Sequence, residues 1–257
     1  MATFLFNDLV YGPIHSRRLG NSLGINLLPT EKKYCNFNCI YCECGANIPG
    51  HAGNLPKRQD IAAALEKKLI SLKQDDIKVD SITFAGNGEP TIHPDFHEVI
   101  SDTVNLRNKF CPDAKISVLS NATRIVNENT VATLKMIDNC ILKIDSGIEE
   151  TAKAIDRPVG NYSLKKQVEL LKNFDGNFVL QTMFLSGDVN GKKIDNTTPE
   201  EVSAWLKIVE ELRPKKVMIY TIARDTPEKN LQKASKETLD NIQKKVQDLG
   251  IEISVSY

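Results

Sequence analysis

The sequence of 257 residues has no excess of either charge, no long apolar run and no basic leader at its N-terminus. Lysine plus arginine and aspartate plus glutamate number 33 each, so the net charge is zero and gives no global sign of nucleic-acid or anionic-membrane binding. No stretch reaches the roughly 18 apolar residues that a membrane span needs. Because the opening MATFLFNDLVYGP also lacks the features of a signal peptide, we expect a cytoplasmic protein without a membrane partner.

Cysteine is scarce, with six in the chain, and four of these six lie in the single stretch KYCNFNCIYCECG at positions 33–45. Thiols stay reduced in the cytoplasm, so disulfides are disfavoured and metal-binding or catalytic roles are favoured. A zinc ribbon needs two well-separated pairs of cysteines, whereas the other two, Cys111 and Cys140, are isolated and suit packing in a core. The stretch at 33–45 is therefore the first candidate for a functional site.

Short β-branched runs alternate along the chain with longer amphipathic runs. The alternation predicts a parallel sheet with right-handed crossovers. Six strand–helix units are too few for a closed eight-fold barrel, so we expect an α/β fold, a partial (β/α)6 TIM-like barrel whose sheet is open on one side. We expect one domain over 1–257, with a segment 1–20 before the first core strand and the cysteine loop at about 30–45. The predicted strands are 23–28, 81–84, 116–119, 141–144, 178–184 and 217–222, and the predicted helices are 58–72, 94–109, 128–136, 164–173, 199–211 and 236–249.

Polar residues lie at or near the end of every predicted strand, where ligands collect in folds of this kind. The cysteine loop follows the first strand, AGNGEPTIHP the second and SNAT the third. The last three strands carry Lys143 with Asp145, then Gln181, then Tyr220 with Arg224. These groups predict a single polar mouth at one edge of the sheet. The Gly/Asn/Lys-rich segment 188–198 is expected to be a loop, either a lid or a plain surface loop.

Three of the clustered cysteines, Cys35, Cys39 and Cys42, form the pattern C-x3-C-x2-C, and Cys44 follows two residues later. Three closely spaced thiolates on a loop suit iron–sulfur ligation. A cluster of four irons held by three cysteines leaves one iron free to bind another molecule. Cys44 is either a spare ligand for a different cluster state or, as we favour, a structural thiol, because a fourth ligand would occupy that free iron.

The cysteine motif, with Tyr41 just before its last cysteine, resembles the signature of the radical S-adenosylmethionine (radical SAM) superfamily. GNGEP (86–90) ends the second predicted strand, where that superfamily has its GGEP-type motif, and the agreement extends from Tyr11 to Arg224. GPIHSRRLGNSLGINLLP (12–29) resembles bacterial radical SAM proteins of largely unassigned function, which are distantly similar to wybutosine-type tRNA-modifying enzymes. We expect no RNA-handling extension of the kind that those enzymes carry, because after Pro29 the chain has room only for the barrel.

The resemblance implies two cofactors, a 4Fe–4S cluster and S-adenosylmethionine. Cys35, Cys39 and Cys42 would ligate the cluster, and the amino and carboxylate groups of S-adenosylmethionine would chelate its open iron. The reduced cluster would pass one electron to the sulfonium, leaving methionine and a 5′-deoxyadenosyl radical that abstracts hydrogen from the substrate. The protein then supplies orientation and exclusion of water, and a flavodoxin- or ferredoxin-type partner supplies the electron.

The resemblance also implies which residues contact the cofactor. Gly86 and Gly88 would let the backbone approach the methionine part closely, and the carbonyls of GNGEP would face its ammonium. Glu89 would either contact this ammonium or support the loop. Lys143 would bind substrate or a carboxylate, or form half of a buried ion pair with Asp145. The expected cofactor residues are Tyr41 beside the adenine, Ser120 and Asn121 at the ribose, Asp145 at the ribose or the substrate, Gly86, Asn87, Gly88, Glu89 and Pro90 at the methionine part, and Gln181.

The remaining candidates belong to the substrate side. Gln181, Tyr220 and Arg224 are expected to line its deeper part. Arg17 and Arg18 are expected to close over the mouth and bind an anionic substrate; a solvated turn is the alternative for this pair.

Several functions fit this pattern. The leading hypothesis is a radical SAM enzyme acting on a small or nucleobase-like substrate in the barrel mouth. The second is tRNA modification, which the zero net charge disfavours, and the third is an activase that installs a radical on a partner protein. A non-enzymatic electron-transfer protein would hold its cluster with four protein ligands and bind no S-adenosylmethionine, and a zinc-binding structural protein would hold a tetrahedral metal.

Overall fold

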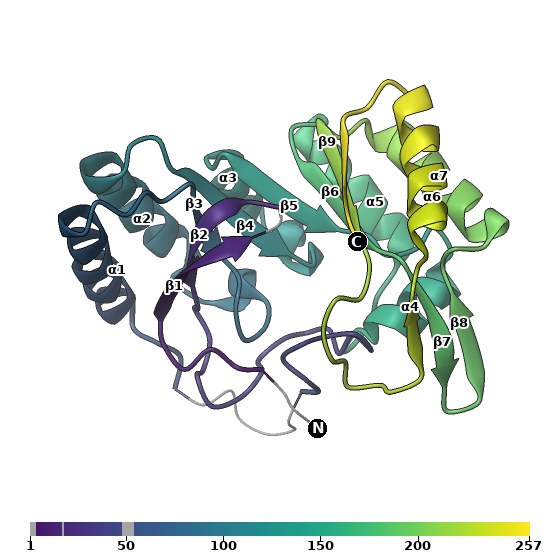
Figure 1. Cartoon of the computed structure of the whole chain (residues 1–257), viewed down its shortest axis with the longest axis horizontal. Helices are drawn as coiled ribbons and strands as arrows, with labels where there is room; N and C mark the ends of the chain where they lie inside the picture. Colours follow the sequence, from purple (N-terminus) through teal and green to yellow (C-terminus); the bar gives the residue numbers. More distant parts are fainter. Residues whose placement is uncertain (1–3, 17, 48–53) are drawn as a thin grey trace.

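The computed structural model describes residues 4–16, 18–47 and 54–257, and its main feature is a curled sheet of eight strands (Figure 1). These strands are β1 (Val10–Ser16), β2 (Gly20–Ile25), β3 (Ser81–Phe84), β4 (Lys115–Ser120), β5 (Asn139–Lys143), β6 (Val179–Met183), β9 (Lys216–Tyr220) and β11 (Ile253–Ser256). They lie in the order β1-β2-β3-β4-β5-β6-β9-β11, and every neighbouring pair is parallel except β1 with β2. This half-barrel confirms the expected partial TIM-like fold.

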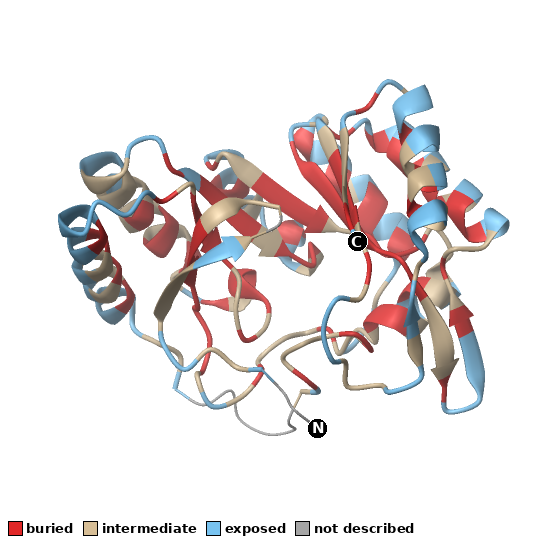
Figure 2. Ribbon diagram, viewed as in Figure 1, coloured by how far each residue is buried: buried red, intermediate tan, exposed pale blue. Residues whose placement is uncertain are grey.

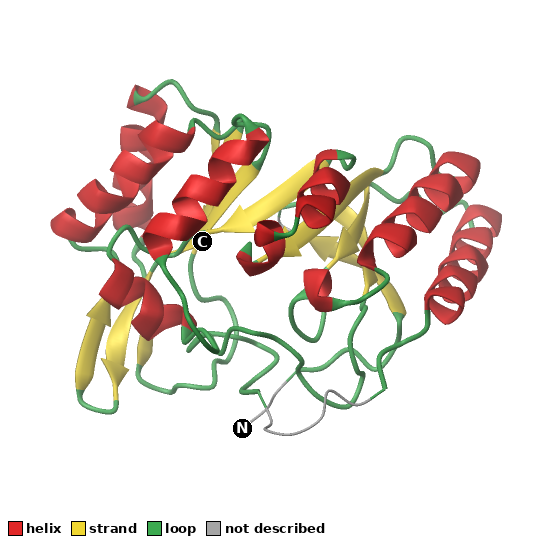
Figure 3. Ribbon diagram, turned by 180° about the vertical axis from the view of Figure 1, so that it is seen from behind, coloured by secondary structure: helices red, strands yellow, loops and turns green. Residues whose placement is uncertain are grey.

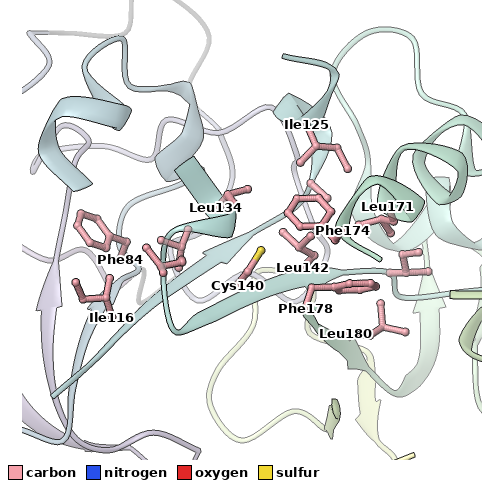
Figure 4. Packing of buried hydrophobic residues seen from close by; sticks show 14 of the residues in the cluster. Phe84, Ile116, Ile125, Leu134, Cys140, Leu142, Leu171, Phe174, Phe178 and Leu180 are labelled. Atoms are coloured by element: carbon pink, nitrogen blue, oxygen red, sulfur yellow. The ribbon is translucent and has the colours of Figure 1, made fainter. Parts of the chain in front are cut away.

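Helices pack along the outer side of this sheet (Figure 3). Outward-facing strand residues such as Phe84, Leu142 and Leu180 form one large core with them, and Cys140 packs in the same core, as expected (Figure 4). The strands are mostly buried, whereas the far sides of the helices are exposed (Figure 2). The helices are α1 (Arg58–Gln74), α2 (Phe96–Phe110), α3 (Glu128–Lys135), α4 (Glu149–Asp156), α5 (Leu164–Leu171), α6 (Pro199–Leu212) and α7 (Lys236–Asp248), with short 3-10 turns η1 (Pro90–Ile92), η2 (Thr123–Val126) and η3 (Lys172–Phe174).

The predicted strands and helices all exist, and their ends agree within two residues except at β2, which is displaced by three from the prediction. Helix α6 shows why the ends are predictable. Pro199 is its first residue, and the Thr198 hydroxyl accepts the N–H of Glu201 at 3.3 Å, so a local cap starts the helix. None of the helices in the described residues is both long and apolar enough to cross a membrane.

A second, smaller sheet was not predicted. It has the order β10-β7-β8 and consists of β10 (Leu231–Lys233), β7 (Leu185–Val189) and β8 (Lys192–Asp195). The expectation of a loop over 188–198 is therefore wrong. Asn190 and Gly191 have φ values of 55° and 79° and form the turn of the β7–β8 hairpin, since two residues of positive φ suit the twist of a hairpin.

Strands β1 and β11 and helix α4 were also not predicted. Strand β1 contains Gly12 and Pro13, which interrupt the run of β-branched and apolar residues typical of a strand. Its register with β2 shifts between Tyr11 and Ile14. Proline is tolerated there because β1 is an edge strand.

Candidate active site

The cysteine stretch 33–45, called the cluster loop below, is held by backbone hydrogen bonds from two sides. On one side the Tyr34 N–H donates to the Asn87 carbonyl, in the loop after β3, at 2.7 Å. On the other side the Ile40 N–H donates to the Ile155 carbonyl, in α4, at 2.9 Å. These two anchors place the cysteines at the carboxyl ends of the strands.

Gly88 allows the cluster loop to approach the loop after β3. Its φ is +147°, and an added Cβ would lie 1.8 Å from the carbonyl oxygen of Tyr34. An added Cβ at Gly86 would lie 2.7 Å from Oδ1 of Asn26. The sequence assigned both glycines to the methionine part of the cofactor, whereas the close contacts seen here are to the chain itself.

We expect Gly88→Ala to displace the cluster loop, because the Cβ has no space unless the backbone moves. The free energy of unfolding should fall by more than about 1 kcal/mol, and less iron should be incorporated after anaerobic reconstitution. Urea unfolding and iron per chain measure the two effects. Gly160→Ala is the matched control, since Gly160 also has a positive φ but nothing within 4 Å of an added Cβ. Equal stability of the two variants would contradict the proposed role of the Tyr34 contact.

Cys35, Cys39 and Cys42 are free, half-buried thiols whose charges interact with one another. The fourth thiol, Cys44, donates a hydrogen bond to the Gly86 carbonyl at 3.2 Å. Within the described parts of the chain, no three His, Cys, Asp or Glu side chains converge on one position for a metal ion. Thiols that bind three separate irons need no such convergence, so the donor set fits a cluster held by three cysteines better than a single zinc ion.

The thiols of the cluster loop differ in acidity. Burial raises the pKa of Cys35 to about 12 and the pKa of Cys39 well above its ordinary value. The neighbouring Cys44 thiol lowers the pKa of Cys42 to about 5, and the nearby ammonium of Lys33 acts in the same direction. Because the thiolate is the form that binds metal, Cys35 and Cys39 would release their protons as iron binds.

Lys143, at the end of β5, directs its ammonium at the cluster loop. Its Nζ lies 3.2 Å from Cys39 Sγ and 2.9 Å from the Tyr41 hydroxyl. It also lies 3.0 Å from Asp145 Oδ2 and pairs with Asp156. An ammonium has three N–H donors, and four acceptors surround this one. Of the two roles expected for Lys143, the structure therefore shows the buried ion pair with Asp145, and its donors are already engaged within the chain.

The carboxylates beside Lys143 are deeply buried, with Asp145 1% and Asp156 2% exposed. Burial raises the pKa of Asp156 to about 7, although Lys143 opposes this shift. Burial also disfavours the ammonium, but the two carboxylates outweigh it and hold the pKa of Lys143 above its ordinary value. Asp145 has both oxygens engaged, since it accepts hydrogen bonds from the Tyr41 hydroxyl and from the Met183 N–H.

Asp156 was missed by the sequence analysis. It ends α4, which was not predicted, and no motif surrounds it. Its carboxylate lies 3.5 Å from Cys39 Sγ, and its carbonyl accepts the N–H of Asn38 at 2.9 Å. Only the tertiary structure brings α4 to the cluster loop.

A small second core joins the cluster loop to the smaller sheet. Its buried members come from the loop, from α4 and from the segment that leads from β6 through the β7–β8 hairpin. They are Ile40, Tyr41, Ile155, Met183, Leu185, Val189 and Ile194. The β7–β8 hairpin therefore packs against the cluster loop and stabilises its position.

Glu89 was expected either to contact the cofactor or to support its loop, and its contacts here are of the supporting kind. Its carboxylate, 2% exposed, accepts the Thr91 N–H at 3.1 Å, the Asn121 N–H at 2.7 Å and the Ser120 hydroxyl at 2.8 Å. It also accepts the Thr91 hydroxyl. Glu89 therefore joins the loops after β3 and β4.

We expect Glu89→Gln to lower the free energy of unfolding by about 1–3 kcal/mol, because an amide NH2 would replace an acceptor and leave a buried donor unpaired. Denaturant unfolding measures this loss. Glu66→Gln is the control, since Glu66 is half-buried and pairs with the exposed Lys109 on the surface of the helices; its effect should stay within about 0.5 kcal/mol. A loss as small as the control's would show that the carboxylate is not needed for the loop.

The amides expected at the cofactor are bonded within the chain. The Asn87 NH2 donates to the carbonyls of Phe6 and Pro29 at 2.9 and 2.8 Å. The Asn121 NH2 donates to Asn36 Oδ1 at 2.7 Å. These side chains hold the loops after β3 and β4 in place, next to the cluster loop.

Two residues of the expected substrate side lie in the barrel interior. Gln181 is 6% exposed, and its Nε2 has no hydrogen-bond partner. Burial and the nearby Asp145 carboxylate raise the pKa of Tyr220 to about 12, so its hydroxyl is neutral at physiological pH. The guanidinium carbon of Arg18 lies 4.7 Å from the centre of the Tyr220 ring.

The arginines expected at the mouth and deeper site are placed differently. Arg18 lies in the turn between β1 and β2, at the amino ends of the parallel strands, so the expectation that it closes over the mouth is wrong. Arg17 lies outside the described residues. The Arg224 side chain is 62% exposed and pairs with Glu43 at 2.6 Å, so it does not line the deeper site.

Comparison with known proteins shows which family and which relatives the chain is similar to. The family model of the Radical SAM superfamily matches residues 33–197. GTPase Obg of Brachyspira hyodysenteriae is 31% identical over 253 residues, which are 96% of this chain and 35% of that protein. UPF0026 protein MJ1312 of Methanocaldococcus jannaschii is 29% identical over 240 residues, with coverage of 91% and 70%.

A solved structure shares the fold. SuiB of Streptococcus suis, bound to S-adenosylmethionine, superposes with a TM-score of 0.64 at 15% identity and covers 91% of this chain and 50% of that chain. This chain therefore spans about a third of the Brachyspira protein and half of the SuiB chain.

Proposed function

The chain belongs to the radical SAM superfamily, and we propose that the cluster loop is the site at which it cleaves S-adenosylmethionine reductively. The members of this superfamily are enzymes that use a 4Fe–4S cluster and S-adenosylmethionine and require an external reductant. When bound, these cofactors supply methionine and a 5′-deoxyadenosyl radical that abstracts hydrogen from a substrate.

The main support for this proposal is the division of the four clustered thiols. Cys35, Cys39 and Cys42 would hold the cluster, because they form the pattern C-x3-C-x2-C and lie on a loop anchored from two sides. Cys44 is engaged with the Gly86 carbonyl. Three protein ligands would leave one iron of the cluster free to bind S-adenosylmethionine.

Residues around the cluster loop would bind and orient S-adenosylmethionine. We assign Gly86, Asn87, Gly88, Glu89 and Pro90 to the methionine part, Ser120, Asn121 and Asp145 to the ribose side, and Tyr41 to the adenine. Many of their polar atoms already bond within the chain, and these bonds keep the loops in a fixed geometry before the cofactor binds. Their carbonyl oxygens keep a second lone pair for a ligand.

The substrate would bind in the interior of the half-barrel, beside Gln181 and Tyr220. We propose a small or nucleobase-like molecule and a flavodoxin- or ferredoxin-type protein as electron donor, in the cytoplasm. The zero net charge of the chain disfavours tRNA as the substrate. Lys143 would act by holding Cys39 and Tyr41 in place and by excluding water from the cluster loop.

The direct test is the formation of 5′-deoxyadenosine. The protein is reconstituted with iron and sulfide without oxygen, reduced with dithionite and given S-adenosylmethionine. We expect 5′-deoxyadenosine by liquid chromatography and a changed electron paramagnetic resonance spectrum of the reduced cluster. A reaction without dithionite is the control. An intact cluster that yields no 5′-deoxyadenosine and an unchanged spectrum would overturn the proposal.

A further inference from the structure

The interior face of the half-barrel carries polar side chains that bond mainly to one another. The hydroxyls of Ser22 and Thr83 are 2.7 Å apart, those of Ser81 and Thr83 3.0 Å, and those of Ser81 and Ser117 2.9 Å. The Asn139 NH2 donates to the Ser117 hydroxyl at 3.0 Å. This part of the wall therefore needs no ligand to satisfy its polar groups.

Two other interior groups lack such partners. Nη1 of Arg18 and Nε2 of Gln181 are both buried and make no hydrogen bond. A buried donor without a partner costs about 1–3 kcal/mol, so each one needs an explanation. Because both groups are donors, their common missing partner would be an acceptor.

The two donors come from different elements, Gln181 from β6 and Arg18 from the turn between β1 and β2, and both lie beside interior residues of β9. Gln181 on β6 pairs in register with Met218 on β9. Met218 and Arg18 line one cavity of about 500 Å³ at the amino ends of the strands. The Arg18 guanidinium lies over Tyr220, two residues beyond Met218 on β9. A cavity of this size suits a small molecule.

The charge on Arg18 is also unbalanced. The three lysines of this cavity all have partners, since Lys216 pairs with Glu252 at 2.8 Å, Lys115 pairs with Asp138 at 3.4 Å, and Lys215 donates to the Asp138 carbonyl at 3.0 Å. No carboxylate in the described ranges pairs with Arg18. A planar guanidinium with free N–H groups favours an oxyanion, which accepts charge-assisted hydrogen bonds.

We infer that the substrate carries a carboxylate or phosphate group and that Arg18 and Gln181 bind it inside the half-barrel. This inference rests on the proposed radical SAM function and names the substrate class of that site. The anionic end would lie beside Arg18 and Gln181, and the part that loses hydrogen would point to the cluster loop. Arg18 would thus bind the substrate from the end of the barrel opposite the mouth.

The test is a binding titration of the cluster-loaded protein with two probes, sodium succinate and inorganic phosphate, at constant ionic strength with S-adenosylmethionine present. Isothermal titration calorimetry gives the Kd. We expect saturable binding of at least one probe, and binding weaker by roughly 10- to 150-fold in Arg18→Met and Gln181→Leu, the effect of one hydrogen bond to a charged group. Binding of succinate alone indicates a carboxylate, and binding of phosphate alone a phosphate.

Matched variants separate this effect from a general loss of charge or of folding. Arg58→Met removes an exposed arginine paired with Asp102 and should leave the Kd unchanged. Arg18→Lys keeps the charge and should bind more tightly than Arg18→Met. No saturable binding of either probe, or equal Kd values for wild type and Arg18→Met, would overturn the inference. If the wild type still forms 5′-deoxyadenosine, such a result leaves the proposed function intact.

Discussion

Cys42→Ala is expected to abolish 5′-deoxyadenosine formation, whereas Cys44→Ala is expected to retain most of it. Cys42 would be one of three ligands to the cluster, and two thiolates cannot hold it in a stable form. Cys44 instead donates to the Gly86 carbonyl at 3.2 Å, so its loss removes a contact behind the ligands. A weak thiol donor that is not itself a ligand should matter less than the about 10-fold loss that is the lower limit for groups orienting metal ligands.

The two variants are compared by measuring both the iron bound per chain and the amount of 5′-deoxyadenosine formed. Cys42→Ala should lose bound iron and product together, and Cys44→Ala should keep its iron. Cys111→Ala is the control, because Cys111 is isolated from the cluster loop in the sequence and lies at the end of α2. If Cys44→Ala loses iron as fully as Cys42→Ala, the cluster has four protein ligands, and the electron-transfer alternative replaces the enzyme proposal.

Lys143→Met is expected to lower the free energy of unfolding by about 3–5 kcal/mol, the usual cost of breaking a buried ion group by removing one partner. Methionine has nearly the same length, so the change removes the charge with little change in packing. Asp145 and Asp156 would then remain buried without their cation. Anaerobic urea unfolding measures the loss, and iron per chain shows whether the cluster loop still binds the cluster.

Two further variants define this effect. Lys153→Met removes an exposed lysine that pairs with Glu149 on α4, and it should cost no more than about 0.5 kcal/mol. Asp156→Asn combined with Lys143→Met should recover part of the lost stability, because one uncompensated carboxylate disappears. A loss below about 1 kcal/mol in Lys143→Met would show that the buried ion group does not hold the cluster loop.

Much of the fold was predictable because its signals are local. Strand and helix periods lie within single segments, and the cap at Thr198 uses residues three positions apart. The β7–β8 hairpin carried an equally local signal in Asn190–Gly191, which the composition of the surrounding segment obscured. Strand β1 was missed because Gly12 and Pro13 break its pattern, although an edge position tolerates them.

The candidate site was only partly predictable. The sequence predicts that Lys143 and Asp145 lie together at one strand end, with Asp145 as a possible ion-pair partner, and the structure places them 3.0 Å apart. The sequence did not identify Asp156, which completes that group from α4, or the Arg18 position at the opposite end of the strands. The partners of these residues depend on which loops meet above or below the sheet, and single-segment patterns do not contain this information.

By itself, the sequence determined the half-barrel class, the superfamily and the three cysteines proposed as ligands, because repeated strand–helix units and C-x3-C-x2-C are properties of the linear chain. Only the tertiary structure decided that Asp156 joins the Lys143–Asp145 pair, that Cys44 bonds to Gly86, and that Arg18 enters the interior from the far end. The physical reason is that each of these contacts joins segments that are distant in the chain or differ in element. Burial and charge give such contacts their energy only after the sheet has brought the segments together.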